Sequence, residues 1–190
     1  MTWKQHCNKI FKKINSNIAL LRRIKQFLPL NIRKLFYNSY ILPHLDYCCH
    51  LWGASPFMKR LYKIQKRAIR VICDARYNAS TEDLFKSMYI MPLPDRIFYK
   101  NICMVFKCLN NLAPQYMDSL FTIINHRRVT RSTAQNLLEI PMTNKDFYRR
   151  GFTVNGAKQW NSVNLNIRSS NSFGSFKTSY LKDYWNNLTF

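Results

Sequence analysis

The clearest candidate for chemistry is a set of basic side chains spaced along one stretch of the chain. At about 100° per residue, six cations between residues 59 and 70 fall on one face of a helix, with apolar residues on the opposite face. The six are Lys59, Arg60, Lys63, Lys66, Arg67 and Arg70. At 1.5 Å per residue the stripe would be about 16 Å long, enough to meet two or three successive phosphates. The spacing therefore predicts a surface that binds a nucleic-acid backbone.

A run of charges can also be only the solvated face of a helix. Such a face usually alternates Lys or Arg with Glu, because ion pairs four residues apart stabilise a helix. This stretch has no acidic residue before Asp74. Phosphate binding is therefore the preferred interpretation.

The first helical stretch is also basic, and nine Lys or Arg precede the first acid, Asp46. We expect its cations to line the same groove as those of residues 59–70; they are Lys12, Lys13, Arg22, Arg23 and Lys25. A basic amphipathic helix can instead lie on an anionic membrane surface. Two such helices joined by a tight proline turn pack more naturally against each other, so no membrane partner is expected.

Potential metal ligands and nucleophiles are few. His44, Cys48, Cys49 and His50 form the one close group, and His44 lies one helical turn before Cys48. No C-x-x-C or H-x-x-x-H spacing completes a site, and Cys48 is more simply a small core residue. We expect no metal and no cofactor. Aromatic residues such as Tyr62 and Trp160 can stack on bases, although most are expected in the core.

Composition narrows the function classes. The 190 residues carry a formal charge of +21, which is hard to tolerate unless a polyanion offsets it. Hydrophobic residues make up 47% of the chain, which predicts a folded core. With nine acids and no Asp-Asp, HExxH, GxSxG or P-loop motif, most hydrolases and metal-dependent transferases are excluded. The composition predicts a nucleic-acid-binding protein that is not an enzyme.

Cysteine usage and hydropathy bear on the compartment. Six cysteines are too sparse for a disulfide scaffold in a chain of this length, which favours a reducing compartment. The longest stretch without a charge, Tyr47–Met58, is shorter than the roughly 20 residues of a spanning helix. Lysines interrupt the first 14 residues, unlike a signal peptide. A soluble, intracellular protein is expected.

Periodicity predicts a mainly α fold. Expected helices begin at a capping box of Thr2 and Gln5, at Asn31, at Ser55 with Pro56, and at Ser80; a buried helix covers 97–112 and a closing helix covers 172–188. Pro43 should bend or end the second. Residues 126–135 are polar and basic, and 137–140 resemble a short strand. We expect a basic helical bundle over 1–125 and a less regular extension over 126–190 with at most a small β element.

Several segments, taken in order, resemble a known family. They are Leu28–Cys48, Trp52-Gly53, Leu61–Arg70, Leu84-Phe85, Met91-Pro92-Leu93 with Arg96, Thr130-Arg131, Trp160-Asn161-Ser162, Ile167-Arg168, and Ser172-Phe173 with Phe176-Lys177. Their order and spacing are similar to the part that follows the polymerase palm in jockey-like non-LTR retrotransposon reverse transcriptases. The resemblance covers nearly the whole chain. One departure is that Val163-Asn164 stands where Leu-Pro often follows Trp-Asn.

The resemblance implies a thumb and C-terminal extension without catalytic aspartates, because the family carries these in the palm upstream. A helical thumb presents basic helices to the primer and template backbones. We therefore expect a non-catalytic fragment of an RNA-directed DNA polymerase that binds RNA, DNA or hybrid duplex through phosphates. A palm, or a second copy, would cover an apolar face drawn from Phe36, Tyr37, Tyr40 and Trp52. A free-standing nucleic-acid-binding protein derived from such an element, and a decayed product without function, are the alternatives.

Overall fold

The computed structural model describes residues 3–124 and 136–188, and both ranges are mainly helical. Within them the one β feature is an isolated antiparallel bridge between Ile123 and Leu138. The mainly α fold class is therefore confirmed, and the strand expected over 137–140 is reduced to this bridge. Thr2 and the polar stretch 126–135 lie outside the described residues.

The chain divides into two compact units, Met1–Ile97 (unit 1) and Phe98–Phe190 (unit 2). This division falls within helix α7 (Leu93–Leu109), whereas the change in composition near residue 125 falls inside unit 2. A functional boundary near residue 125 therefore stays a prediction. The two units are described separately below.

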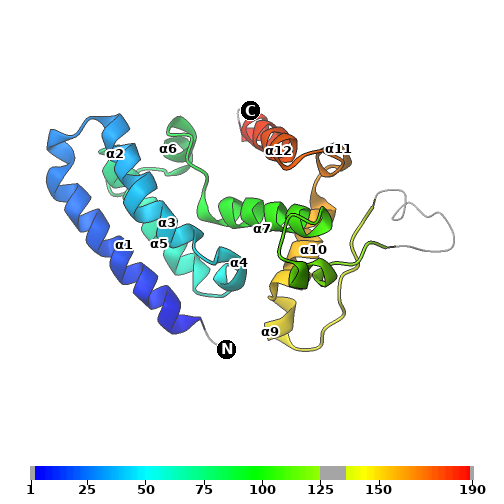
Figure 1. Ribbon diagram of the computed structural model, residues 1–190. Coiled ribbons are helices and arrows are strands. Elements are labelled where there is room, and N and C mark those ends of the chain that lie inside the picture. Colours follow the sequence, from blue (N-terminus) through cyan, green and yellow to red (C-terminus); the bar gives the residue numbers. More distant parts are fainter. Residues whose placement is uncertain (1–2, 125–135, 189–190) are drawn as a thin grey trace. The chain divides into compact units, whose positions relative to one another are not determined.

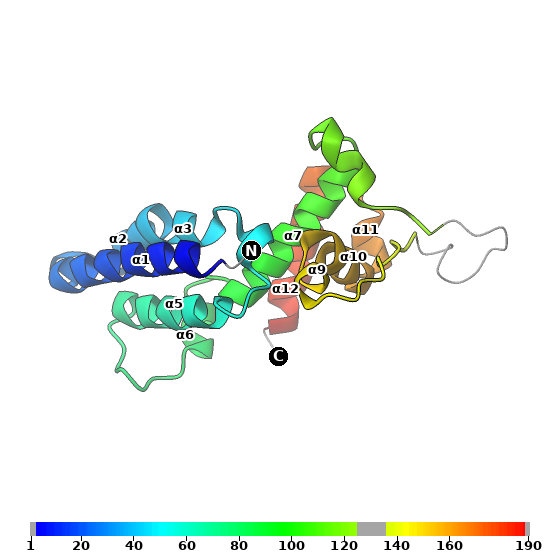
Figure 2. The same ribbon diagram turned by 90° about the horizontal axis from the view of Figure 1, so that it is seen from below.

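Unit 1 is built on a bundle of three helical rods (Figures 1 and 2). The first is α1 (Lys4–Ile24), the second runs from α2 (Leu30–Phe36) to α3 (Leu42–Asp46), and the third is α5 (Met58–Ile72). Helix α1 contacts both of the other rods. Its buried residues recur every three or four positions; they are Cys7, Ile10, Ile14, Ile18 and Leu21. The amphipathic pattern of the sequence thus produces the expected bundle.

Helix α1 ends five residues before Pro29. It stops at Ile24, and a 3₁₀ turn, η1 (Lys25–Phe27), follows before Pro29. Pro29 fixes an extended backbone with ψ of 161°, and α2 begins directly after it at Leu30 instead of after Asn31. The proline therefore sets the start of the second rod, and a side-chain cap from Asn31 is not used.

Pro43 neither ends nor sharply breaks the second rod. A π-helical segment, η2 (Tyr37–Ile41), precedes it, and the Leu42 N–H donates to the Tyr37 carbonyl five residues back. A proline in a helix lacks its own N–H and clashes with the preceding turn. The wider π turn makes room for the ring, and the helix continues as α3 to Asp46.

A tight corner joins the second and third rods. Cys48 adopts a left-handed conformation with φ of 49°, and the short helix α4 (Cys49–Trp52) follows it. A Cβ on Gly53 would lie 2.5 Å from the Cys49 carbonyl oxygen and 2.6 Å from Cγ2 of Ile97, so only glycine fits. Helix α5 begins at Met58, so the predicted start at Ser55 and Pro56 was wrong. The Met58 N–H donates to the Ser55 carbonyl, which closes a turn ahead of the helix.

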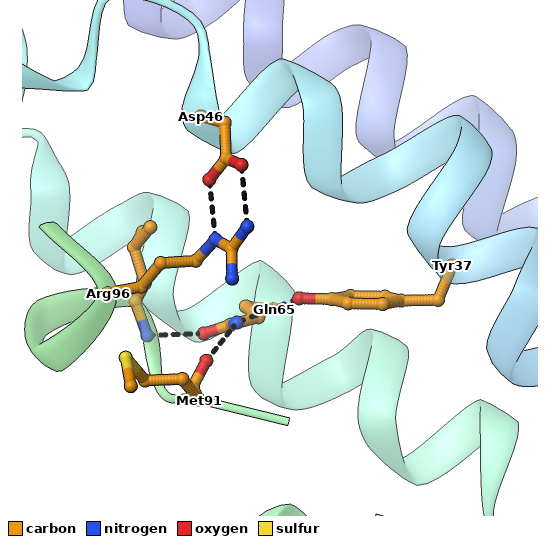
Figure 3. A network of polar contacts seen from close by, with 6 residues as sticks. Tyr37, Asp46, Gln65, Met91 and Arg96 are labelled. Atoms are coloured by element: carbon orange, nitrogen blue, oxygen red, sulfur yellow. Dashed lines mark hydrogen bonds and ion pairs between the residues drawn. The ribbon is translucent and has the colours of Figure 1, made fainter. Parts of the chain in front are cut away.

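A buried polar network ties the third rod to the start of α7 (Figure 3). Gln65 is fully buried; its Nε2 donates to the Tyr37 hydroxyl at 2.9 Å and to the Met91 carbonyl at 3.2 Å. Its Oε1 accepts from the Leu93 N–H at 2.8 Å. Burial raises the pKa of Tyr37 to about 12. The hydroxyl therefore stays neutral inside the bundle at physiological pH.

An ion pair lies beside this network. The Arg96 guanidinium donates to both Asp46 carboxylate oxygens, at 2.5 and 2.6 Å (Figure 3). Both side chains are only 22% exposed. The pair joins the end of α3 to the first turns of α7. The remaining helix of unit 1, α6 (Glu82–Ser87), contacts α5.

Unit 2 packs the rest of α7 against further helices of different lengths. They are η3 (Gln115–Leu120), α9 (Asp146–Arg149), α10 (Phe152–Ser162), α11 (Leu165–Arg168) and α12 (Phe173–Leu188). The core is aromatic: the Phe106 ring lies 4.7 Å from Phe176 and 6.4 Å from Trp160. Gly156 lets α10 approach Val105, since a Cβ there would lie 3.1 Å from Cγ2. The closing helix expected at 172–188 is confirmed.

Candidate nucleic-acid interface

Helix α5 turns its cations away from the core. Its apolar positions Leu61, Ile64, Ala68 and Ile72 are buried. On the opposite side, Lys59, Arg60, Lys63 and Arg67 are exposed, while Lys66 and Arg70 are half-buried. The helix therefore presents a basic outer face, although its six cations do not share one environment.

Two of the arginines lie over the seam between α5 and α1. Arg60 Nη1 donates to Asn8 Oδ1 at 3.0 Å, and Arg67 Nη1 donates to Asn15 Oδ1 at 3.1 Å. The Arg60 guanidinium also lies 4.0 Å from the centre of the Phe11 ring. In each pair, the two residues are 52 positions apart in the sequence. The two helices therefore run parallel, and the contact between them repeats after seven residues, which is two helical turns. The neutral amides orient the guanidinium groups without neutralising their charge.

The other four cations differ in how they are held. Arg70 Nε donates to the Ala79 carbonyl at 3.0 Å and so fastens the loop that follows α5. Lys66 Nζ lies 4.5 Å from the centre of the Tyr62 ring. Lys59 and Lys63 have no side-chain partner within the described part of the chain. The three lysines are thus the cations of α5 that no hydrogen bond to the protein restrains.

Acidic residues leave this face unneutralised. Two acids of unit 1 are engaged elsewhere, since Asp46 pairs with Arg96 and Asp74 pairs with Lys25. Burial raises the pKa of Tyr62, and the negative charges of Asp95 and Glu82 raise it further, which places these acids on the Tyr62 flank of α5. Within the described ranges, none of the six cations forms an ion pair with a carboxylate. The outer face therefore keeps its positive charge.

The cations predicted on α1 do not gather in one place. Lys12, Lys13, Arg22 and Arg23 are all exposed. At about 100° per residue, Arg22 falls on the flank that faces α5, Lys12 and Arg23 fall opposite the core, and Lys13 falls on the other flank. Lys12 and Lys13 both line a pocket with His44 of α3, whereas Arg22 and Arg23 do not. Lys25 is already paired with Asp74. One continuous groove that holds all the α1 cations is thus not what the structure presents.

The structure also bears on the other residues that the sequence singled out, which are the potential metal ligands and the predicted apolar docking face. Cys48 is exposed, so its interpretation as a small core residue was wrong, whereas Cys49 is buried. Within the described residues, no three His, Cys, Asp or Glu side chains are grouped as a metal site would require. No described helix combines the length and the apolar character needed to cross a bilayer. Tyr37 and Trp52 are fully buried, so their proposed part in an exposed docking face was wrong. Tyr37 binds Gln65, and Trp52 Nε1 donates to the Tyr47 carbonyl.

Residues that carry the family resemblance mostly hold the fold together. In unit 1 they include every member of the buried network and of the ion pair beside it; these are Tyr37, Asp46, Gln65, Met91, Leu93 and Arg96. In unit 2, Trp160 is buried, and the Asn161 side chain bonds both the N–H and the carbonyl of Leu138 at 2.8 Å. Their spacing thus follows from packing and hydrogen bonding.

Sequence analysis missed Asn8 and Asn15, which position the two seam arginines. Their seven-residue spacing equals that of Arg60 and Arg67, and this match is the signal that was available.

In comparisons with known proteins, no family model, no curated protein and no solved structure matches this chain.

Proposed function

We propose that this protein binds nucleic acid through backbone phosphates, and that it is the non-catalytic thumb and C-terminal part of a non-LTR retrotransposon reverse transcriptase. The observation that carries the proposal is the outer face of α5, where Lys59, Lys63 and Lys66 form no ion pair and no hydrogen bond with any residue of the described ranges. Phosphates are the ligands that such a face would attract. Binding would take place inside cells and would discriminate little between base sequences.

The seam arginines support this proposal. Asn8 and Asn15 hold Arg60 and Arg67 at an interval of two helical turns, beside the free lysines. A guanidinium bonded through one Nη still has donors left for a phosphate oxygen. Orienting it beforehand lowers the entropy lost on binding. Arg70 is better regarded as a structural residue, because its Nε is committed to the Ala79 carbonyl.

Two alternatives make different predictions. A free-standing binding protein derived from such an element would be expressed and would bind as an isolated chain. A decayed product would leave no transcript or protein in cells.

Exposed apolar side chains on α1, α2 and η2 form the surface that a palm or a second copy would cover. They are Leu20, Leu30, Ile32, Leu35 and Tyr40. A clean monomer in sedimentation at micromolar concentration would argue against self-association through them.

Salt dependence tests phosphate binding at α5. Changing Lys59, Lys63 and Lys66 together to Gln removes three positive charges and no hydrogen bond to the protein, although Lys66 also loses its contact with the Tyr62 ring. Each phosphate contact on a duplex contributes about −0.9 to the slope of log K against log salt. We expect the triple variant to flatten the slope for an RNA–DNA hybrid by about 2 to 3. The measurement is a fluorescence anisotropy titration at several salt concentrations.

The matched control removes the same charge from unit 2. Lys145, Lys158 and Lys182 are exposed lysines, and their change to Gln should leave the slope within about 1 of the original, since no contact is proposed there. Circular dichroism should show both variants folded. If the two triple variants change the slope equally, binding follows net charge alone and the assignment to α5 is wrong.

A further inference from the structure

A second basic feature lies on the other flank of α1, where it faces α3. A pocket of about 470 Å³ opens there, lined by His6, Lys9, Ile10, Lys12, Lys13, His44 and Tyr47. Pockets for small molecules usually measure about 300 to 1,000 Å³. The lining is mostly apolar, because the lysine stems, Ile10 and the Tyr47 ring form it, while the ammonium groups lie at the end of those stems.

The charge of the pocket has one sign. Three of the lining residues, Lys9, Lys12 and Lys13, are exposed lysines, and none is acidic. The acid at the end of α3, Asp46, accepts hydrogen bonds from two nitrogens of Arg96, so its negative charge is already paired. The pocket therefore favours an anion, and three neighbouring ammonium groups suit the several oxygens of a phosphate.

One wall of the pocket is aromatic and well supported. The Tyr47 side chain is 67% exposed, and its ring centre lies 6.4 Å from that of His6 at 40°. Trp3 meets the same imidazole edge-on at 6.1 Å. The Tyr47 carbonyl accepts from the buried Trp52 Nε1 at 2.8 Å, so its backbone is fixed. An exposed tyrosine on a fixed backbone offers a face on which a base can stack.

The geometry points to a binding site for one unpaired nucleotide, with its base against Tyr47 and its phosphate among Lys9, Lys12 and Lys13. The same chemistry would accept a free mononucleotide or a nucleotide within a single strand. Tight binding therefore requires a ligand that carries both a base and a phosphate.

This site is separate from the proposed duplex surface. At 100° per residue, His6 and Lys13 lie about 160° and 140° from Asn8 around α1, on the flank opposite the α5 seam, while Lys12 lies between the pocket and the seam. Duplex binding by α5 could fail while the pocket still binds a nucleotide, and the reverse also holds. The two proposals are therefore tested by different variants and different probes.

Calorimetric titration of the full chain tests base recognition. The probes are adenosine 5′-monophosphate, ribose 5-phosphate and inorganic phosphate. We expect the nucleotide to bind about tenfold more tightly than the other two, because its base stacks on the Tyr47 ring. Tyr47→Leu should weaken the nucleotide about tenfold and leave the weak binding of phosphate unchanged. Tyr77→Leu, at a tyrosine that is 88% exposed elsewhere in unit 1, is the matched control and should change nothing.

The phosphate half of the site needs its own variant. Changing Lys9 and Lys13 to Gln should weaken all three probes, whereas Lys59 and Lys63 changed to Gln should weaken none. A 5′-phosphorylated single strand and a hairpin duplex then distinguish the source of the nucleotide. If Tyr47→Leu weakens the single strand and not the duplex, the nucleotide belongs to a strand; if it weakens only the monophosphate, the ligand is free. Equal binding of phosphate and nucleotide, or equal effects of Tyr47→Leu and Tyr77→Leu, would overturn the proposal.

Discussion

Unit 1 holds its polar side chains in two different ways, one inside the bundle and one on the outer face of α5. Inside, Gln65 bonds three groups from two distant segments, and Arg96 is matched by both oxygens of Asp46. Outside, none of Lys59, Lys63 and Lys66 forms an ion pair with an acid in the part of the chain that the structure describes. The interior polar groups are saturated, so they can only stabilise the fold. The outer ones remain available to a ligand.

The same α5 residues 59–72 contribute to both regions, on opposite faces. A helix that only needed solubility would place acids among its exposed lysines. A helix that only needed a core would not bury Gln65, because an amide inside a bundle is costly unless each of its groups is bonded. The difference between the two faces therefore separates stability from binding, and substitutions on each face should affect one and not the other.

The largest expected effect is on the interior. Gln65→Met keeps the length of the side chain but leaves the Leu93 N–H and the Met91 carbonyl without their partner. We expect the free energy of unfolding to fall by about 3 kcal/mol, as buried polar groups lose their bonds. Chemical denaturation measures this loss. The salt slope of nucleic-acid binding should stay unchanged wherever the variant is folded.

An exposed glutamine of unit 1 provides the control. Gln26→Met, in the 3₁₀ turn after α1, should change stability by less than about 0.5 kcal/mol. If Gln65→Met were no more destabilising than Gln26→Met, the interior network would contribute nothing, and the contrast between the two faces would be lost.

The next effect compares a buried ion pair with an exposed one. Asp46→Asn removes the charge that faces Arg96 and one of its two acceptors, in a pair that is 22% exposed on each side. We expect a loss of about 2 kcal/mol in the free energy of unfolding. Asp74→Asn breaks the pair with Lys25, in which Asp74 is 63% exposed, and should cost much less.

The exposed pair of Lys25 and Asp74 should make the stability of the protein depend on pH in the acid range. The hydrogen bond from Lys25 lowers the pKa of Asp74 below its ordinary value of 3.8, and the Lys25 charge lowers it further. The stability from this pair is therefore present above that ordinary value and is lost as the pH falls through the folded value. Thermal melts between pH 5 and pH 2 should show a smaller decline in Asp74→Asn than in the original. An identical decline would mean that the pair adds no stability.

The smallest effect concerns the seam between α1 and α5. Changing Asn8 and Asn15 to Ala removes the two amides that orient Arg60 and Arg67 and leaves every charge in place. We expect stability to change by less than about 1 kcal/mol, and affinity for a hybrid duplex to fall about fivefold because the arginines must be ordered on binding. The salt slope should not move. Asn38 and Asn78, both exposed, give a matched pair of Asn→Ala changes that should leave affinity unaltered.

The sequence predicted these features unequally. Apolar spacing was sufficient for α1 and α5, because each of these helices buries one face along its own length. It was not sufficient for Gln65, whose burial depends on Tyr37 and Leu93, each 28 residues away. Nor did it decide between a helix that ends at Pro43 and one that continues through it, since a π turn depends on the packing of both flanking helices. The sequence also did not distinguish Arg70 from the other cations of α5, because its hydrogen bond to the Ala79 carbonyl depends on the path of the loop after the helix.

Lysine footprinting tests the central claim most directly, because it needs no substitution. The chain is acetylated with and without a saturating RNA–DNA hybrid, and the modification of each lysine is quantified by mass spectrometry. The account predicts protection of Lys59, Lys63 and Lys66, with Lys145, Lys158 and Lys182 modified equally in both samples. Equal modification of the three α5 lysines with and without the hybrid would contradict it.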